Sequence, residues 1–475
     1  MLTRYTATRL AELIRGREVS PVEVVEAHLR RIEELNPHLN AVVTLAPDAI
    51  SRARSMEAAI MRGDLVGALH GVPFTVKDTI ETQGVRTTSG SLMRAAYVPL
   101  EDAPSVARLK AAGAIMIGKT NVSEMAMNYD ADNPVFGRTN NPHDTARTPG
   151  GSSGGCAAAI SACLSPASLG SDMTGSVRVP AHFCGICSLK PTTGRIAASG
   201  HLPLTTGPFS LAASLGPMAR SVEDLALFYG ALAGRDAAGP APALASRIER
   251  LRGWRVAWYT DDGVTPVTAE TRRAVEAAAR SLEEAGLLSD EQRPPGVERA
   301  PGLWPALFAR ASALQLREVY KGHEEKAGDF VRAMLANAER AQPPTLDEFI
   351  EAWMERDRLR AALLEWMKVW PLVVAPVGAA PAFEHGSRKV RVGDQTLSVF
   401  RAFSYSQTYN VFGLPVACVP AGNSMEGLPI GIQIIGRPFD EESVLAAALI
   451  VERSLGGWQP PPPPFALSPE GDNPL

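Results

Sequence analysis

Apolar positions near the start of the chain recur with the period of a helix. Between Val24 and Ile32 they fall on one face, and Ser20-Pro21-Val22-Glu23 just before them is a capping box with proline at the first helical position. Short runs rich in β-branched residues at 72–80 and 114–117 predict buried strands. The chain therefore opens on helices and continues with alternating helices and strands.

The pattern changes after this first stretch. Residues 132–155 hold no apolar run and many Asn, Pro, Gly and Ser, and an alanine-rich stretch follows at 156–163, so we expect an ordered loop that leads into a helix. The other predicted elements are a strand and a helix between Gly253 and Gly286, a surface connection at 287–302, helices over 303–368, strands at 372–376 and 416–420, and a helix at 444–453.

Composition and charge exclude several classes of function. The 475 residues, 45% of them apolar, can form a large core, and 47 basic against 51 acidic residues give a net charge of −4. With no basic stripe and no polybasic patch, we expect a small-molecule substrate and no nucleic-acid or membrane partner. The charged N-terminus and the five cysteines predict a cytoplasmic protein without a transmembrane helix.

Residues Gly113 to Thr120 match the nucleotide-binding pattern G-x-x-x-x-G-K-[ST]. A loop that cradles phosphates follows a strand and opens a helix. Here the apolar run 114–117 lies between the two glycines and leaves no free loop. The pattern therefore predicts a buried strand with a tight turn on each side.

Residues Gly150 to Gly154 match G-x-S-x-G, the nucleophile elbow of α/β-hydrolases. An elbow needs a buried strand directly before its serine. Residues 140–149 cannot form that strand, because they are polar and contain Pro142 and Pro149. No downstream histidine stands in a distinctive setting either, so the sequence argues against an α/β-hydrolase.

Cys184 and Cys187 form a C-x-x-C pair, which raises the alternative of a structural zinc site. Such a site needs two further ligands. No second pair occurs in the sequence, and the neighbouring His182 would supply only a third ligand. We therefore expect two buried structural cysteines and no metal.

A longer set of motifs occurs in a fixed order along the chain. The central part runs from Thr148 to Arg195 and contains T-P-G-G-S-S-G-G, G-S-D-M-T-G-S-V-R-V-P-A, C-G and L-K-P-T-T-G-R. The flanking motifs are HGVPFTVKD at 70–78, FGRTNNP at 136–142, GPMARSVEDLA at 216–226, FGLPVACVPAG at 412–422 and GLPIGIQIIG at 427–436. Together they resemble the amidase signature family over nearly the whole chain, with no family motif at about 236–370.

The resemblance implies a Ser-Ser-Lys catalytic set. It places the catalytic lysine at Lys77, the bridging serine, on a cis peptide bond, at Ser152, and the nucleophile at Ser176. These residue types suit the chemistry, because a serine hydroxyl needs an adjacent base and no histidine in the motifs is placed to serve. A lysine can be that base only when burial keeps it neutral, and a serine hydroxyl can relay the proton.

The same resemblance implies the surroundings of the nucleophile. The expected oxyanion hole consists of the backbone N–H groups of Met173, Thr174, Gly175 and Ser176. The polar residues expected to support the loop are Ser153, Asp172 and Arg178. One position departs from the family, which usually has glycine where this chain has Thr174. A β-branched residue disfavours positive φ, so either φ is negative there or the loop is altered.

The fold that the resemblance implies is a single α/β amidase-signature domain, with a large mixed β-sheet flanked on both faces by helices. We expect this catalytic domain at 1–458 and a proline-rich tail at 459–475. The expected parts of the domain are N-terminal helices at 1–65, a signature core at 66–235, a variable region at 236–370 and a C-terminal core segment at 371–458. The segments expected to form the substrate pocket are 124–132, 303–330 and 376–401.

The implied reaction is hydrolysis of a linear carboxylic amide to a carboxylate and ammonia or an amine, through an acyl-enzyme on Ser176 and without a metal or organic cofactor.

One alternative is the amidase (glutaminase-type) subunit of a tRNA-dependent amidotransferase, which needs partner chains. Residues 196–217 lack the tyrosine- and Asp-Gln-bearing stretch associated with that subunit. A non-catalytic binding module on the same scaffold is disfavoured because all three catalytic residues are present. The sequence does not identify which amide is cleaved. It does not fix the oligomeric state either, for which a homodimer is one alternative.

Overall fold

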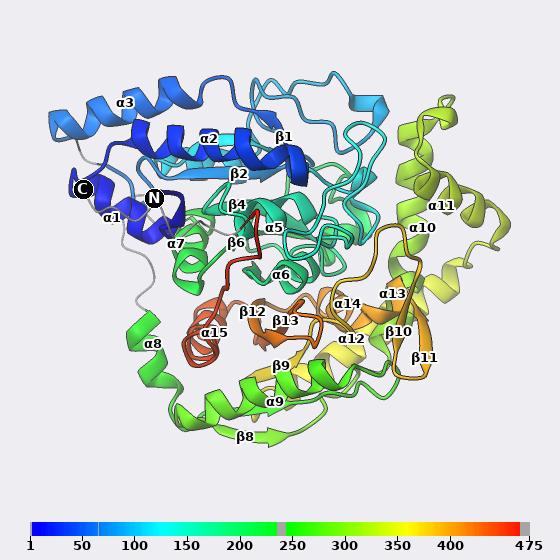
Figure 1. The fold of residues 1–475 in the computed structure, drawn as a ribbon. Helices are drawn as coiled ribbons and strands as arrows, with labels where there is room; N and C mark the ends of the chain where they lie inside the picture. The colour runs from blue at the N-terminus through cyan, green and yellow to red at the C-terminus, as the bar shows by residue number, and fades with distance from the viewer. Residues whose placement is uncertain (1, 65, 235–243, 466–475) are drawn as a thin grey trace.

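The described part of the computed structural model, residues 2–64, 66–234 and 244–465, is built on an eleven-stranded mixed sheet (Figure 1). The strand order is β1-β3-β2-β4-β6-β5-β12-β13-β9-β7-β8. These strands are β1 (Val42–Leu45), β2 (Pro73–Lys77), β3 (Ile115–Thr120), β4 (Ala167–Asp172), β5 (Cys187–Lys190), β6 (Ser214–Ala219), β7 (Arg255–Trp258), β8 (Leu288–Glu291), β9 (Leu372–Pro376), β12 (Val416–Asn423) and β13 (Pro429–Gly436). A separate antiparallel hairpin consists of β10 (Lys389–Val392) and β11 (Gln395–Ser398).

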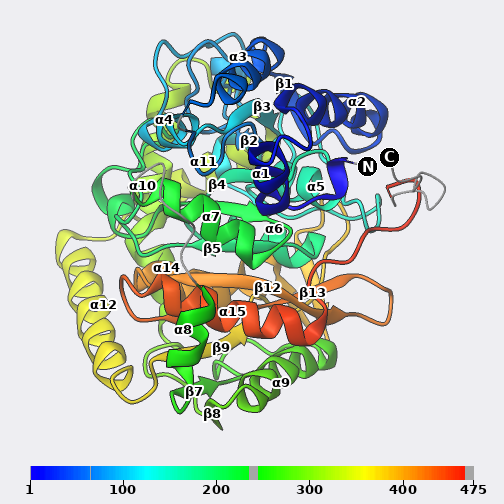
Figure 2. The same cartoon turned by 90° about the vertical axis from the view of Figure 1, so that its left-hand side faces the viewer.

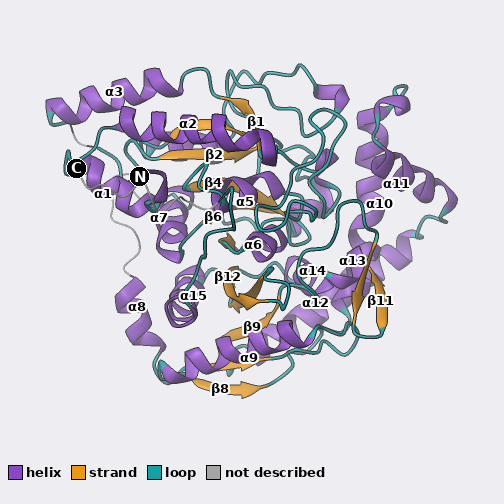
Figure 3. Cartoon of the chain, in the orientation of Figure 1, coloured by secondary structure: helices purple, strands orange, loops and turns teal. Residues whose placement is uncertain are grey.

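Helices surround this sheet (Figure 3). They are α1 (Ala7–Arg15), α2 (Pro21–Leu39), α3 (Ala49–Arg62), α4 (Pro104–Ala111), α5 (Gly154–Ser161), α6 (Arg178–Cys184), α7 (Val222–Leu232), α8 (Leu244–Leu251), α9 (Ala269–Glu284), α10 (Ala300–Tyr320), α11 (Asp329–Arg340), α12 (Leu346–Trp366), α13 (Val399–Ala402), α14 (Ser404–Val411) and α15 (Glu441–Leu455). Among the described residues, none of these helices is long and apolar enough to cross a membrane.

The central strands show that both faces of the sheet are covered. In β12, Ala417 and Val419 pack in the cluster that includes α7, α9 and α15, the face seen in Figure 2. Cys418, between them, packs instead with Val179 and Phe183 of α6. Successive side chains of a strand point to opposite faces, so helices lie on both. The predicted fold, one α/β domain with a large mixed sheet between helices, is confirmed.

Several local predictions are confirmed. The Ser20 hydroxyl and the Glu23 carboxylate form the capping box at the start of α2. Most of the nucleotide-binding pattern is the buried strand β3, as predicted, but the strand continues through Gly118, where a tight turn was expected. Its Lys119 is buried and donates to the carbonyl of Ile80. A lysine held in this way is not presented to a phosphate. The loop before Ser152 contains no strand, which agrees with the argument against an elbow.

Eight of the described strands occur where the sequence predicted none: β1, β4, β5, β6, β8, β10, β11 and β13. β8 lies within the expected surface connection, and it pairs only with β7 at the exposed edge of the sheet, which explains its polar composition. β4 is fully buried and pairs parallel with β2 and antiparallel with β6. Because β2 and β4 are parallel neighbours, their carboxyl ends lie at the same edge of the sheet. Lys77 is the last residue of β2, and Asp172 is the last residue of β4.

The stretch after α15 returns to the N-terminal helices. Phe465 is 3% exposed, and its carbonyl accepts a hydrogen bond from the guanidinium of Arg31 on α2 (3.0 Å). Residues 466–475 of the predicted tail lie outside the described residues.

Candidate active site

A buried lysine and two serines meet at the carboxyl ends of β2 and β4. Lys77 Nζ lies 2.6 Å from Ser152 Oγ and 2.9 Å from Ser171 Oγ, and 3.4 Å from the Ser171 carbonyl oxygen. The Gly151–Ser152 peptide bond is cis, as the resemblance implied. Two of the three predicted catalytic residues are thus in direct hydrogen-bond contact.

Burial controls the ionisation of Lys77. It lowers the pKa of the amine from 10.5 to about 7, against the opposing effects of Cys156 and Asp172. Removing an ammonium group from water disfavours its charged form. A neutral amine, which a general base requires, is therefore well populated near neutral pH.

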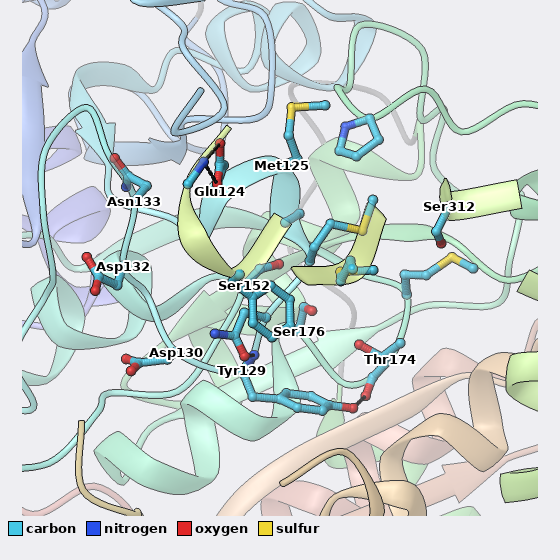
Figure 4. Close-up of a pocket in the computed structure, with 18 of the residues that line it drawn as sticks. Glu124, Met125, Tyr129, Asp130, Asp132, Asn133, Ser152, Thr174, Ser176 and Ser312 are labelled. Carbon is cyan, nitrogen blue, oxygen red and sulfur yellow. Dashed lines mark hydrogen bonds between the residues drawn. The ribbon is translucent and has the colours of Figure 1, made fainter. Parts of the chain in front are cut away.

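Ser176 stands at the turn between β4 and α6. It is 4% exposed, and its carbonyl accepts the N–H of Ser153 (3.1 Å), which ties the two serine-bearing loops together. The turn requires Gly175, because its φ is +107° and a Cβ there would lie 2.4 Å from Cβ of Ser406. Ser152 and Ser176 border the same cavity (Figure 4).

Asp172 organises this turn. Its carboxylate accepts the N–H groups of Gly175 (2.8 Å) and Val177 (3.1 Å) and two hydrogen bonds from Arg178 (2.9 and 3.0 Å). Burial by itself would raise the pKa of Asp172, but Arg178 outweighs it and holds that pKa well below its usual range. The predicted support of the nucleophile loop by Asp172 and Arg178 thus has a direct geometric basis.

The N–H groups of the expected oxyanion hole are not equivalent. That of Gly175 is already engaged by Asp172. Within the described chain, those of Met173, Thr174 and Ser176 donate to no protein acceptor. Three of the four expected donors therefore remain free for a developing oxyanion.

Two aromatic residues that the sequence did not indicate hold the carbonyls of this loop. The Tyr129 hydroxyl donates to the carbonyl of Thr174 (2.6 Å; Figure 4), and Trp304 Nε1 donates to that of Met173 (3.3 Å). Thr174 has a negative φ, and the positive φ falls on Gly175. The unusual threonine is therefore accommodated without a left-handed conformation.

Residues from the C-terminal core segment complete the support. Arg178 is fully buried and donates to Gln433 Oε1 of β13 (2.9 Å) and to Asn410 Oδ1 of α14 (2.5 Å). Asn410 also donates to Asp172 Oδ1 (2.9 Å). No pattern in the sequence indicates these long-range partners, although Gln433 lies in one of the matched motifs.

Ser171 and His201 are also absent from the predicted set. Ser171 Oγ lies between Lys77 Nζ (2.9 Å) and His201 Nε2 (2.8 Å). Ser171 directly precedes Asp172 in a matched motif, so its position was a usable signal. His201 lies in no motif, and nothing in the sequence places it beside the lysine.

A cavity of about 900 Å³ opens over the serines. Each of the three segments expected to form the pocket contributes to its lining. The lining includes several large apolar and aromatic side chains: Met125, Met127, Tyr129, Met173, Phe209, Trp304 and Phe400. The lining is therefore more apolar than polar.

The two cysteines of the C-x-x-C pair are not part of the cavity lining. Cys184 and Cys187 are buried, and Cys187 Sγ lies 3.4 Å from Glu452 Oε1. Both ring nitrogens of His182 are engaged, by the Ala380 carbonyl (3.0 Å) and the Gly431 N–H (2.7 Å). Across the described ranges, no group of three His, Cys, Asp or Glu side chains is arranged to hold a metal ion.

The double variant Cys184→Ser/Cys187→Ser is expected to keep the parent rate of catalysis and to lose about 1–3 kcal/mol of stability for each buried hydroxyl that finds no partner. Activity before and after chelation, together with thermal unfolding, measures both effects. Loss of activity on chelation, with zinc recovered in stoichiometric amount, would show that the pair holds a metal.

Comparison with known proteins agrees with the fold and the motifs. The family model described as Amidase matches residues 23–445. The A subunit of glutamyl-tRNA(Gln) amidotransferase from Heliobacterium modesticaldum is 34% identical over 484 residues, covering 95% of this chain and 97% of that protein. The solved structure of 6-aminohexanoate cyclic dimer hydrolase is 29% identical with a TM-score of 0.83 and covers 96% of this chain and 97% of that chain. A bacterial aryl acylamidase structure is 27% identical with a TM-score of 0.83, covering 95% of this chain and 96% of that chain.

Fold, motifs and relatives together define a hydrolase that acts on amides. The chain belongs to the amidase signature family, as its motifs predicted.

Proposed function

We propose that this protein hydrolyses a linear carboxylic amide, with Ser176 as nucleophile, Ser152 as proton relay and Lys77 as base. The observation that carries the proposal is the 2.6 Å contact between Lys77 Nζ and Ser152 Oγ, buried beneath a cavity that Ser176 also borders. The lowered pKa of Lys77 supports it, because a base must be neutral before it can accept a proton.

Acylation begins when Ser176 Oγ forms a bond to the amide carbonyl carbon. Its proton passes to Ser152 Oγ, and the Ser152 proton passes to Lys77 Nζ. The carbonyl oxygen becomes an oxyanion that accepts hydrogen bonds from the N–H groups of Met173, Thr174 and Ser176. As the tetrahedral intermediate collapses, the C–N bond breaks and the proton returns from Lys77 through Ser152 to the leaving nitrogen.

Deacylation repeats the sequence with water as nucleophile. Water attacks the ester carbon and gives a proton to Ser152, which passes its own to Lys77. The ester C–O bond then breaks, the proton returns from Lys77 through Ser152 to Ser176, and the carboxylic acid leaves and ionises to the carboxylate in solvent. Every proton transfer in these steps passes through Ser152 and Lys77, so the proposed reaction needs no metal or organic cofactor.

The charges around the cavity favour an uncharged substrate with a bulky apolar group. The buried carboxylates of Glu124, Asp130 and Asp172 all accept hydrogen bonds from protein groups. The remaining charged side chains of the lining lie at its rim, exposed or half-buried: Asp132, Glu325, Lys326, Asp329, Arg332 and Arg388. An ionised group of a substrate deep in the cavity would have no oppositely charged partner, and burying an unpaired charge weakens binding.

A second candidate function is the glutaminase-type subunit of a tRNA-dependent amidotransferase. The 34% identity to the corresponding subunit of a glutamyl-tRNA(Gln) amidotransferase favours it. It would bring partner chains and a tRNA-linked substrate, at odds with the expected absence of a nucleic-acid partner. Free glutamine carries both an ammonium and a carboxylate, which suits the apolar lining less well.

Ammonia or amine release by the purified chain alone distinguishes the two. We expect an aryl or other bulky apolar amide to give a higher kcat/KM than glutamine. Phe400→Ala removes an apolar wall that packs on Trp304 at 5.0 Å between ring centroids and should lower kcat/KM for that amide about tenfold. A short aliphatic amide should be unaffected by the change.

Leu346→Ala is the matched control, because Leu346 is 72% exposed on α12 and is not part of the cavity lining. Leu346→Ala should leave kcat/KM unchanged for both the bulky apolar amide and the short aliphatic amide. The second candidate function replaces the first if the protein prefers glutamine and hydrolyses it only when amidotransferase partner subunits are added.

A further inference from the structure

His201 lies beside the proposed base in a segment whose backbone is fixed to the chain that follows Lys77. His201 and Ile80 form an antiparallel bridge, and the N–H of Leu202 donates to the carbonyl of Thr79 (2.9 Å). His201 is 8% exposed and borders the cavity. Backbone pairing therefore sets the position of the ring.

The hydrogen bonds of His201 define its tautomer. Nδ1 is 2.8 Å from the carbonyl oxygen of Pro203, which can only accept, so Nδ1 carries the hydrogen. Nε2 is then an acceptor in the neutral ring. It lies 2.8 Å from Ser171 Oγ, so the serine hydroxyl donates to it. Burial, reinforced by the charge of Lys77, lowers the pKa of His201 to about 3 and favours the neutral ring.

The direction of this hydrogen bond determines what Ser171 offers to Lys77. With its hydrogen directed at His201, Ser171 Oγ can only accept, and Lys77 Nζ lies 2.9 Å away. The same amine reaches the Ser171 carbonyl at 3.4 Å. A neutral amine has two hydrogens and one lone pair. Both hydrogens are thus directed at Ser171, and the lone pair faces Ser152 Oγ at 2.6 Å.

We propose that His201 is a positioning residue which, acting through Ser171, holds the lone pair of Lys77 toward Ser152 and so sets the direction of proton transfer. The inference rests on the proposed function of Lys77 as the base. When the proton moves from Ser152 to Lys77, neither Ser171 nor His201 gains or loses one. The pair orients the base and takes no part in the covalent steps.

Three other ionisable side chains act on the same residues. Asp172 at the end of β4 and Cys156 on α5 raise the pKa of Lys77, whereas Lys119 on β3 lowers that of His201. All three stay unchanged in the variants that follow. A shift in pH dependence therefore reports on the hydrogen bond from Ser171.

The test is the rate at which a fluorophosphonate labels Ser176, measured at pH values on both sides of the pKa of Lys77. In His201→Leu the Ser171 hydroxyl loses its acceptor and competes with Ser152 for the lone pair. Labelling should slow about 10- to 100-fold. The midpoint of the pH profile should move down, because a donor to the lone pair favours the neutral amine. His201→Gln, whose amide oxygen can accept from Ser171, should restore most of the rate.

A double-mutant cycle separates this role from a structural one. In a Ser171→Ala background, His201→Leu should slow labelling no further, because His201 acts only through Ser171. His143→Leu is the matched control. His143 is a half-buried histidine that likewise lies beside a backbone carbonyl and a serine hydroxyl, those of Cys184 (3.1 Å) and Ser161 (3.3 Å). Its loss should leave the labelling rate unchanged.

The outcomes separate this inference from the proposed function. An unchanged rate and midpoint in a folded His201→Leu protein, or additive losses in the cycle, would overturn the role of His201 and leave Ser176 as the nucleophile. No labelling of Ser176 in the parent would overturn the proposed function instead. Thermal unfolding identifies a variant that fails to fold. If His201→Leu fails to fold, Ser171→Ala carries the test, and a parent rate and midpoint in that variant would overturn the inference.

Discussion

Ser176→Ala is expected to reduce turnover by about 10⁴-fold or more and to leave thermal unfolding close to that of the parent. The change removes the attacking oxygen, whereas a methyl group fits a position that is only 4% exposed. Amide hydrolysis and fluorophosphonate labelling, with the labelled peptide mapped by mass spectrometry, measure the effect.

Ser165→Ala is the matched control, since Ser165 is also a buried serine but donates to the Ala167 carbonyl (2.7 Å) outside the site. It should keep both turnover and labelling. Label that persists in Ser176→Ala, or that maps to Ser152, would sink the assignment of the nucleophile and revive the elbow interpretation of Gly150–Gly154.

The rate of the parent enzyme on a neutral amide is expected to rise with pH through about 7 and then level off. Burial lowers the pKa of Lys77 to about 7, so the neutral, proton-accepting amine predominates above that pH and is lost below it. Lys77→Ala should lose about 10²- to 10⁴-fold in kcat/KM across the whole range. Lys77→Arg should not restore it, because arginine does not deprotonate. The pH profile of kcat/KM is the measurement.

A second buried lysine supplies the control. Burial also lowers the pKa of Lys190 to about 7, and its Nζ donates to the Pro191 carbonyl (2.9 Å). Lys190→Met should retain the rise with pH if Lys77 is the group that titrates. Should Lys77→Ala keep most of the parent rate at every pH, Lys77 is a structural residue and the proposed mechanism fails.

The predictable parts of the fold are those in which local signals and burial agree. The helix from Pro21 carries its own cap and apolar stripe, so sequence and structure coincide at its start. β4 has the sequence Ala-Ser-Leu-Gly-Ser-Asp, with no alternation and no β-branched residue. Its conformation depends on β2 and β6 on either side, and that information lies outside the segment.

The candidate site also contains residues that the sequence predicts and residues that it does not. Lys77, Ser152 and Ser176 stand in motifs whose order along the chain could be matched, so they were predictable. His201 reaches Ser171 only because its segment pairs with the chain after β2, a contact that no local pattern encodes. The hydrogen bond from Tyr129 to the nucleophile loop was likewise unpredictable, since a tyrosine in a polar loop has no preferred partner.

The placement of β12 between β5 and β13 has a consequence for truncated forms of the protein. Asn410 and Gln433, which hold the buried guanidinium of Arg178, follow that arginine by 232 and 255 positions in the sequence. A polypeptide that ends before Asn410 would therefore contain Lys77, Ser152 and Ser176 but would lack both β12 and the side chains that hold Arg178. We expect such a truncated polypeptide to be inactive.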